Sequence, residues 1–440
     1  MKNIVVLLLA GGDSNRLWPL SEKLFIPVLG KPLIYYVLAQ LQRFGVREVV
    51  IVHNDKNKSL FEHTRSSFPN VSITLVEQTD SRGMAGAVIS AQKYISDREL
   101  LIVGPSDIYE DILLADFVKL AGTRPDGILS GTVVDTYFPG AYLTMKGKTI
   151  TGIIEKPIPS RVPSNIVNFV FDYFKNGRII IEAIEKATTK NDDVYEKAIE
   201  LLIHAGTAFT FLPYKGFWGY LKYPWHVLNV SSYFLGKIKG RKIKNAMIDK
   251  SAVISGDVYI EDGVKILENV KIVGPCYIGK GTIIGNNSII RESTIGENCV
   301  IGFTSEIARS YVGNGCWFHH NYIGDSVISD NVSMGAGTVL ANFRLDEQSI
   351  TSKVGEKGQN TGKTKLGAMI GPNVRIGVNA SLMPGVKIGK NSFIGAAACI
   401  DTDIPENTFI RLRNGKLASK ENKAFIEDND REKIRKNLKV

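Results

Sequence analysis

The sequence predicts an α/β domain with a mixed, mainly parallel sheet, followed by a parallel β-helix. Two observations support this prediction. In the first part of the 440-residue chain, apolar runs alternate with segments whose apolar residues have helical spacing, which is typical of a parallel sheet covered on both faces. From about residue 250 onward, isoleucine recurs at every sixth position, a period that fits a coil of short strands and turns.

The α/β elements follow from the apolar pattern in chain order. The strands are predicted at Ile4–Ala10, Glu48–His53, Ser72–Val76 and Glu99–Val103, and the helices at Leu33–Phe44, Ala85–Tyr94 and Pro224–Gly236. Ligands of such sheets bind at the carboxyl ends of the strands. Functional residues are therefore expected directly after the predicted strands.

The β-helix prediction rests on a long repeat. Isoleucine occupies positions 254, 260, 266, 272, 278, 284 and 290, then 295, 301 and 307, and isoleucine or leucine occupies 370, 376, 382, 388, 394 and 400. We expect these side chains to point inward, with successive coils about 4.8 Å apart. The polar segment Asn342–Thr364 interrupts the repeat and is expected to be an ejected loop, a common place for function. The flat sides of such a coil predict self-association.

These patterns divide the chain into four parts. We predict a first domain at residues 1–230, a linker at 231–248, the β-helix at 249–410 and a charged tail at 411–440. The end of the chain is expected to be helical or frayed, because it is rich in charged residues.

Composition and charge exclude several classes of function. The four cysteines show no metal-binding or disulfide spacing, which favours the reducing cytoplasm. The apolar run at Ile4–Ala10 is too short to span a membrane. The net charge is +10, but no nucleic-acid-binding motif accompanies it. We expect a cytoplasmic protein without nucleic-acid or membrane partners, whose basic character suits small anionic substrates.

A candidate phosphate-binding loop follows the first predicted strand. Ala10, Gly11 and Gly12 stand directly after that strand, where glycines let the backbone approach a phosphate and direct N–H groups at it. Arg16 and Lys23 follow and can neutralise phosphate oxygens.

The string from Ala10 to Ile34, AGGDSNRLWPLSEKLFIPVLGKPLI, resembles the opening signature of the nucleotide-sugar pyrophosphorylases, with Arg16 and Lys23 at the signature cations. Further motifs follow in family order over roughly residues 1–230. The resemblance implies a Rossmann-like domain. It also implies that the nucleotide is bound by Ala10, Gly11, Gly12, Gln78, Gly83 and Met84, the sugar by Glu155, Lys156 and Asn168, and Mg²⁺ by Asp107.

The reaction implied by this resemblance is a direct displacement. An oxygen of a sugar 1-phosphate attacks the α-phosphorus of a nucleoside triphosphate, and pyrophosphate leaves. Arg16 and Lys23 would neutralise the charge that develops, with Mg²⁺ on Asp107. The sequence departs from the family pattern at Ser14, Asn15, Glu22 and Tyr220. Tyr220 occupies the position of a second metal-binding aspartate, and a neutral phenol is a poor ligand for Mg²⁺.

A second candidate site lies in the predicted β-helix, in the strings Trp317–Asp325 and Asn331–Asn342. They resemble the acetyltransferase half of the bifunctional glucosamine-1-phosphate acetyltransferase/uridylyltransferases, most closely the archaeal type. The resemblance implies a left-handed β-helix that assembles as a homotrimer. It also implies that His319 is the general base that deprotonates a sugar amine for attack on acetyl-CoA. The implied substrate and CoA contacts are Arg291, Tyr322, Ala336, Asn342 and Ala396.

This second resemblance also has departures, and two functions remain to be compared. Ala308 and Gln348 replace lysines and Ser333 replaces an asparagine, and the loss of cations weakens binding of a phosphate dianion. The first function is an enzyme that transfers a nucleotidyl group to a sugar 1-phosphate, with or without acetyl transfer. The alternative is a catalytically weak or inactive protein that binds nucleotide sugar and has a regulatory or assembly role.

Overall fold

The computed structural model describes residues 1, 3–424, 433–435 and 438. The chain forms two compact units: unit 1 contains Met1–Asp13 and Leu33–Tyr220, and unit 2 contains Ser14–Pro32 and Leu221–Val440. None of the described helices is both long enough and apolar enough to cross a membrane.

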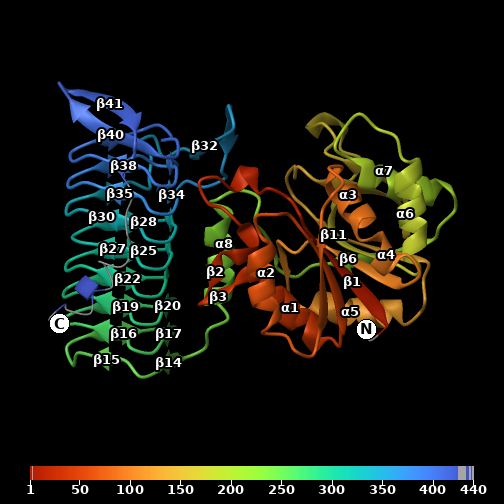
Figure 1. Cartoon of the computed structure of the whole chain (residues 1–440), viewed down its shortest axis with the longest axis horizontal. Helices are drawn as coiled ribbons and strands as arrows, with labels where there is room; N and C mark the ends of the chain where they lie inside the picture. The colour runs from red at the N-terminus through yellow and green to blue at the C-terminus, as the bar shows by residue number, and fades with distance from the viewer. Residues whose placement is uncertain (2, 425–432, 436–437, 439–440) are drawn as a thin grey trace. The chain divides into compact units, whose positions relative to one another are not determined.

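Unit 1 is built on a nine-stranded mixed sheet (Figure 1). Its strands are β1 (Ile4–Ala10), β4 (Glu48–His53), β5 (Ser72–Glu77), β6 (Glu99–Val103), β8 (Gly127–Val133), β9 (Ala141–Lys146), β10 (Thr149–Glu155), β11 (Ile166–Phe174) and β12 (Phe209–Tyr214). They lie in the order β10-β9-β11-β6-β1-β4-β5, and β8 pairs with both β11 and β12. Strands β6, β1, β4 and β5 run parallel, whereas β11 runs antiparallel to β6.

Helices cover both faces of this sheet. They are α1 (Leu33–Arg43), α2 (Lys58–Arg65), α3 (Gly83–Ser90), α4 (Gln92–Ile95), α5 (Asp111–Ala121), α6 (Gly177–Lys186) and α7 (Val194–His204). Residues Ile4–Leu8 of β1 are all buried, as expected for a strand with helices on both sides. The predicted α/β fold is therefore confirmed. The helix predicted at Ala85–Tyr94 is divided into α3 and α4 at Ala91.

Short elements complete unit 1. Strand β7 (Asp107–Tyr109) pairs antiparallel with β13 (Trp218–Tyr220). The 3₁₀ helix η3 spans Pro159–Arg161.

Unit 2 is a left-handed parallel β-helix with three faces, as predicted. Face 1 contains β14 (Arg241–Ile243), β17 (Val258–Ile260), β20 (Cys276–Ile278), β23 (Thr294–Ile295), β26 (Tyr311–Val312), β29 (Val327–Ile328), β34 (Met369–Ile370) and β37 (Lys387–Ile388). Face 2 contains β15 (Met247–Ile248), β18 (Lys265–Ile266), β21 (Ile283–Ile284), β24 (Val300–Ile301), β27 (Trp317–Phe318), β30 (Ser333–Met334), β35 (Arg375–Ile376), β38 (Phe393–Ile394), β40 (Thr408–Arg413) and β41 (Lys416–Glu421). Face 3 contains β16 (Val253–Ser255), β19 (Lys271–Val273), β22 (Ile289–Arg291), β25 (Glu306–Ala308), β28 (Tyr322–Gly324), β31 (Val339–Leu340), β36 (Ser381–Leu382) and β39 (Cys399–Ile400).

The repeated isoleucines form the core of the β-helix. Ile260, Ile278 and Ile295 lie in register on successive coils of face 1, and each is fully buried. Asparagines such as Asn287 and Asn331 adopt the left-handed conformation at the corners, which asparagine tolerates better than most residues. The slip in the repeat after residue 290 coincides with a corner at Glu292, whose φ is 48°.

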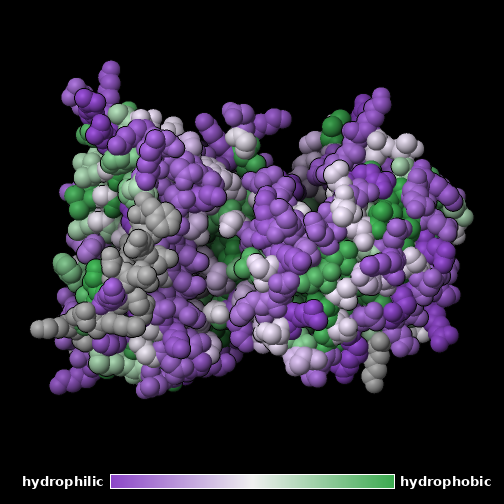
Figure 2. All heavy atoms as spheres, viewed as in Figure 1, coloured by the Kyte–Doolittle hydropathy of each residue, from purple (hydrophilic) through white to green (hydrophobic). Residues whose placement is uncertain are grey.

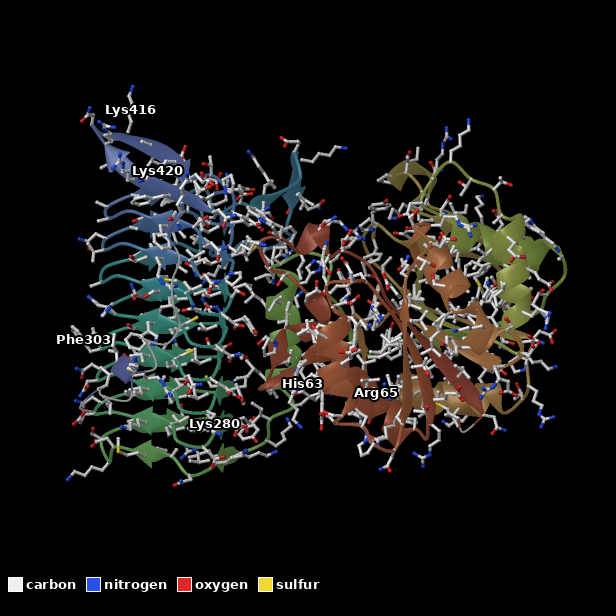
Figure 3. All side chains as sticks on the ribbon, in the orientation of Figure 1. His63, Arg65, Lys280, Phe303, Lys416 and Lys420 are labelled. Carbon is white, nitrogen blue, oxygen red and sulfur yellow. The ribbon has the colours of Figure 1, made fainter. Side chains whose placement is uncertain are left out.

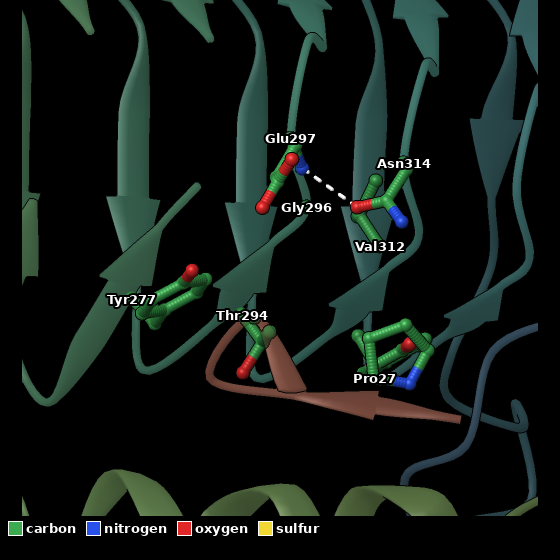
Figure 4. A pocket seen from close by; sticks show the side chains of 9 residues that line it. Pro27, Tyr277, Thr294, Gly296, Glu297, Val312 and Asn314 are labelled. Atoms are coloured by element: carbon green, nitrogen blue, oxygen red, sulfur yellow. Dashed lines mark hydrogen bonds between the residues drawn. The ribbon is translucent and has the colours of Figure 1, made fainter. Parts of the chain in front are cut away.

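Two segments of unit 2 cover face 1. One is Ser14–Pro32, with the 3₁₀ helices η1 (Asn15–Leu17) and η2 (Lys23–Phe25) and the hairpin β2 (Pro27–Val28) and β3 (Lys31–Pro32). The other is α8 (His226–Leu235), whose Ser231 hydroxyl lies 2.7 Å from that of Thr294. A Cβ at Gly30 would lie 2.4 Å from the Tyr277 hydroxyl, so the hairpin packs directly on the strands (Figure 4).

The ejected loop and the end of the chain contain hairpins. Between β31 and β34 the chain forms the antiparallel pair β32 (Thr351–Val354) and β33 (Lys357–Asn360). The predicted charged tail is wrong over its first part, because residues 408–421 form the hairpin β40–β41 (Figure 3). Its turn is Asn414-Gly415, with positive φ at both residues, a strong hairpin signal. Most of the remaining predicted tail lies outside the described residues.

Candidate functional site

The loop after β1 contacts the segment after β5. Gly11 has no room for a side chain, because a Cβ there would lie 2.0 Å from Oε1 of Gln78. The amide of Gln78 donates from Nε2 to the carbonyls of Asp80 (2.9 Å) and Gly83 (3.0 Å). The structure thus brings together three predicted nucleotide-binding residues, Gly11, Gln78 and Gly83, beside the amino terminus of α3.

Other predicted and unpredicted residues surround this loop. Asn57, which the sequence analysis missed, is buried and donates from Nδ2 to the carbonyl of Ala10 at 3.1 Å. Gly12 is exposed, whereas Met84 packs against the core of unit 1. A side-chain hydrogen bond from Arg82 holds the pKa of Asp80 below its ordinary value.

Asp107, the predicted metal ligand, begins β7. Its Oδ1 accepts a hydrogen bond of 3.2 Å from the Trp218 indole N–H. In the β7–β13 pair, Tyr220 is the residue directly opposite Asp107. The Tyr220 ring packs against Trp218 and Phe138, with ring centroids 5.0 and 5.1 Å apart. Aromatic side chains therefore surround the carboxylate on this side.

Asp107 could supply one ligand to a divalent metal ion, but its neighbours Trp218 and Tyr220 are aromatic. Within the described part of the chain, no group of three or more His, Cys, Asp or Glu residues could hold a metal ion. Mg²⁺ is often held by one or two carboxylates together with substrate phosphates. Asp107 fits such an arrangement if the phosphates supply most of the other ligands.

Asn168, a predicted sugar contact, belongs to a buried network. Its Nδ2 donates to the Ser130 carbonyl (2.8 Å) and to Oδ1 of Asp172 (3.0 Å). Tyr195 donates its hydroxyl to Oδ2 of the same carboxyl at 3.0 Å. The register of β11 against β8 shifts between Asn168 and Asp172, and such a bulge re-aims a side chain. Burial raises the pKa of Asp172 to about 7.

Glu155 and Lys156, the other predicted sugar contacts, form an ion pair of 2.5 Å. Lys156 adopts a left-handed backbone with φ of 43°, a strain that is common at functional sites. Glu196 on α7 was not predicted. It is buried, and burial together with the nearby Glu155 raises its pKa to about 8. Glu196 lies on the buried side of α7, and none of the sequence motifs described above includes it.

Arg16 and Lys23 lie in unit 2, on the segment that covers face 1. Arg16 is exposed on η1 and Lys23 is half-buried on η2. Both short helices are anchored by buried leucines, Leu17 and Leu24. Ser14, which replaces a family glycine, has φ of 55°, and a left-handed backbone costs a residue with a side chain roughly 1–2 kcal/mol.

The second candidate site lies where faces 2 and 3 meet. His319 and His320 form the corner after β27 and are exposed. The backbone N–H of His319 donates to Asn321 Oδ1 at 2.8 Å, and its carbonyl accepts from the Ser305 hydroxyl. Asn321 also donates to the Gly335 carbonyl at 2.9 Å. The buried Asn321 therefore fixes the corner that presents His319.

The other predicted acetyl-transfer residues stack along the same corner and the adjoining strands. Gly337 donates to the His320 carbonyl, which places Ala336 on the next coil. A Cβ at Gly377 would lie 2.6 Å from the backbone nitrogen of Ala396, one coil further along. Phe303 stacks on His320 at 6.2 Å and is 62% exposed (Figure 3). Figure 2 shows apolar patches along this edge of the β-helix.

Tyr322 and Asn342 come together on face 3. The Tyr322 hydroxyl donates to Oδ1 of Asn342 at 3.4 Å, and Asn342 donates from Nδ2 to Asp325. A Cβ at Gly324 would lie 2.6 Å from that Nδ2. The contact thus requires a glycine between the two polar side chains.

Two arginines on or beside face 3, Arg291 and Arg309, are paired with carboxylates of the same chain. Arg291 forms an ion pair with Glu306. Arg309 makes two hydrogen bonds of 2.8 Å to Asp325, which raise the pKa of Arg309. Ala308, at the position of a family lysine, is fully buried.

Comparison with known proteins bears on both units. The nucleotidyl transferase family model matches residues 5–220, and the bacterial transferase hexapeptide model matches residues 257–292 and 367–402. The chain is 32% identical to the "Bifunctional sugar-1-phosphate nucleotidylyltransferase/acetyltransferase" of Sulfurisphaera tokodaii, covering 92% of this chain and 99% of that protein. It is 30% identical to the "Bifunctional protein GlmU" of Methanococcus vannielii, covering 94% and 99%. A solved UDP-glucose pyrophosphorylase complexed with UDP-glucose is 16% identical, with a TM-score of 0.49 over 54% of this chain and 100% of that one.

Proposed function

The chain belongs to the family of bifunctional sugar-1-phosphate nucleotidylyltransferases/acetyltransferases, and on this premise we propose how its residues divide the chemistry. The protein is an enzyme that transfers a nucleotidyl group from a nucleoside triphosphate to a sugar 1-phosphate and releases pyrophosphate. The alternative of an inactive binding protein gains no support from these comparisons.

We assign nucleotide binding to the contact between the loop after β1 and the start of α3. The observation that carries this assignment is the close approach of Gln78 to Gly11. The amide of Gln78 would read the base, and the backbone of Ala10–Gly12 would hold phosphate. Arg16 and Lys23 would neutralise charge on the α-phosphate as the sugar phosphate oxygen attacks.

We assign the sugar 1-phosphate to Glu155, Lys156 and Asn168. Both hydrogen bonds donated by Asn168 go to protein partners, which leaves its carbonyl oxygen to accept from a sugar hydroxyl. A bound divalent metal, which we propose to be Mg²⁺ on Asp107, would supply Lewis-acid stabilisation of the phosphates.

The β-helix would carry acetyl transfer to an amino-sugar 1-phosphate. His319 would remove a proton from the amine, which then attacks the thioester carbon of acetyl-CoA and expels the thiolate. Tyr322, Asn342 and Arg291 would hold the acceptor. Ala336 and Ala396 would line the path of CoA along the corner.

We further propose a cytoplasmic homotrimer assembled through face 3. This face exposes Val253, Ile289 and Val339 to 56%, 36% and 38%. Sedimentation of the purified protein at several concentrations tests this assembly.

The nucleotidyl-transfer assignment is tested by pyrophosphate release across nucleoside triphosphates and hexose 1-phosphates. Arg16→Ala and Lys23→Ala should each lower kcat about 100-fold with the preferred pair, whereas Lys93→Ala on α4 should leave it unchanged. Tight binding of a nucleotide sugar without turnover of any pair would instead favour the inactive alternative.

The acetyl-transfer assignment is tested by thiol release from acetyl-CoA with glucosamine 1-phosphate or galactosamine 1-phosphate. His319→Ala should abolish release, and His320→Ala, at the adjacent exposed position, provides the matched control. Equal rates for wild type and His319→Ala would show that the base is another group.

A further inference from the structure

Lys387 is a buried cation on face 1 of the β-helix. It points outward from β37, yet its side chain is only 4% exposed. Its ammonium lies 3.1 Å from Oδ2 of Asp403 and donates to the carbonyl of Lys353. The Trp18 ring covers it, with 5.1 Å from Nζ to the ring centroid.

The equivalent positions of neighbouring coils show that packing on face 1 does not require a charged side chain at position 387. On face 1, the outward residues Val327 and Met369 of the two preceding coils are fully buried and apolar. Burying an ammonium is costly unless carboxylate, carbonyl or aromatic partners replace water. Lys387 has all three kinds of partner, and they come from three separate segments: the corner at Asp403, the ejected hairpin β32–β33, and the segment Ser14–Pro32.

The contact with Trp18 fixes the turn that carries Arg16. Trp18 directly follows η1, and its N–H donates to the carbonyl of Asn15 at 3.4 Å. Pro19 is also held, because a Cβ at Gly371 would lie 2.9 Å from its carbonyl oxygen. The contacts of Trp18 and Pro19 with the β-helix therefore anchor the carboxyl end of η1, two residues after Arg16.

We propose that Lys387 is a positioning residue for nucleotidyl transfer, acting through Trp18 on Arg16. The β-helix then supplies part of the apparatus that orients a nucleotidyl-transfer residue, in addition to its own acetyl-transfer site. This inference rests on the proposed role of Arg16.

The test compares Lys387→Met with Lys390→Met in the full-length enzyme. Lys390 lies after the same strand in an ordinary ion pair with Glu406 (3.3 Å) and is 50% exposed. Because misplacement of a group that stabilises the transition state lowers turnover, Lys387→Met should reduce kcat for pyrophosphate release about tenfold. The KM for the triphosphate should change less than about threefold. Lys390→Met should match wild type, and Lys387→Arg, which keeps the charge and the ring contact, should recover part of kcat.

A second variant guards against a folding defect. Trp18→Leu leaves the pair between Lys387 and Asp403 in place and should lower kcat to a similar extent. The double variant should be no slower than either single one, because both disrupt one contact. Thiol release from acetyl-CoA should stay at the wild-type rate in all three variants, whereas general destabilisation would lower both activities.

Two outcomes separate the possible failures. Wild-type kcat in Lys387→Met, or effects that multiply in the double variant, would overturn the positioning role. Wild-type kcat in Arg16→Ala would instead remove the proposed function on which this inference rests.

Discussion

The two candidate sites hold their polar groups in opposite ways. In unit 1, Asp172 and Glu196 are buried, and burial raises their pKa values to about 7 and about 8. On face 3 of the β-helix, Arg291 and Arg309 are partly exposed and paired with carboxylates. A buried site depends on fit, because a displaced polar atom finds no water to replace its partner. A site displayed on a regular coil depends more on charge.

The largest effect expected from this contrast is that of Gly11→Ala. The new Cβ would displace Gln78, because it would lie 2.0 Å from Oε1. The KM for the triphosphate in pyrophosphate release should rise about 100-fold. Gly152→Ala in the same unit is the control, since no atom lies closer than 3.7 Å to its Cβ. An unchanged KM in Gly11→Ala would show that fit around Gln78 is unimportant.

On the β-helix, Arg291→Met removes a charge while keeping an unbranched side chain. It should raise the KM for an amino-sugar 1-phosphate about tenfold and leave the KM for acetyl-CoA and the melting temperature unchanged. Lys271→Met, at an exposed position of face 3, should change neither KM. A large loss of thermal stability in Arg291→Met would mean that this site also depends on fit.

The variant Tyr220→Asp tests whether a second carboxylate beside Asp107 strengthens metal binding there. The new carboxylate would stand opposite Asp107 in the β7–β13 pair. Binding of Mg²⁺ together with a nonhydrolysable triphosphate, measured by calorimetry, should tighten several-fold, about the effect of one added oxygen ligand. Tyr220→Asn, which is similar in size but uncharged, is the matched variant. Equal metal affinities would place the metal away from this pair.

The smallest effect concerns stability and pH. Glu196 has a pKa of about 8 in the folded protein and an ordinary value of 4.5, so the folded state holds a proton that the unfolded chain releases. Its stabilising contribution is complete below pH about 4.5 and is lost as the pH rises through about 8. The upper limit is about 1.4 kcal/mol for each pKa unit of difference.

Glu196→Gln stays neutral at every pH. Its free energy of unfolding, measured by denaturant titration, should therefore fall less than that of wild type between about pH 5 and pH 8. Glu200→Gln, on the same helix but ion-paired with Lys197 at 2.7 Å, should keep the wild-type slope. Parallel curves for wild type and Glu196→Gln would show that Glu196 is not protonated by burial.

The repeat made the β-helix predictable residue by residue. A hexapeptide period assigns each isoleucine to the interior, and Ile260, Ile278 and Ile295 are indeed fully buried. The glycines after β1 were equally informative, because close approach to Gln78 requires the absence of a side chain at Gly11. Patterns of this kind depend on residues that are close together in the sequence, so they can be predicted without knowledge of the tertiary structure.

Long-range packing could not be predicted in the same way. Nothing in the string from Ser14 to Pro32 indicates that it packs on strands more than two hundred residues later. Glu196 was missed for a related reason, since burial in the folded unit, together with the nearby Glu155, raises the pKa of its carboxyl. The turn at Asn414-Gly415 was a local signal for β40–β41 that the charge of the tail obscured.

The hairpin β40–β41 also determines how the coil stops. A stack of parallel strands ends in unpaired N–H and C=O groups, which are a template for joining another chain end to end. Here β40 occupies the last edge of face 2 and β41 folds back on it antiparallel. The outer strand carries Lys416 and Lys420, and charged edge strands resist such pairing. The hairpin thereby opposes end-to-end pairing of β-helices from different chains, which would otherwise extend the sheet of face 2.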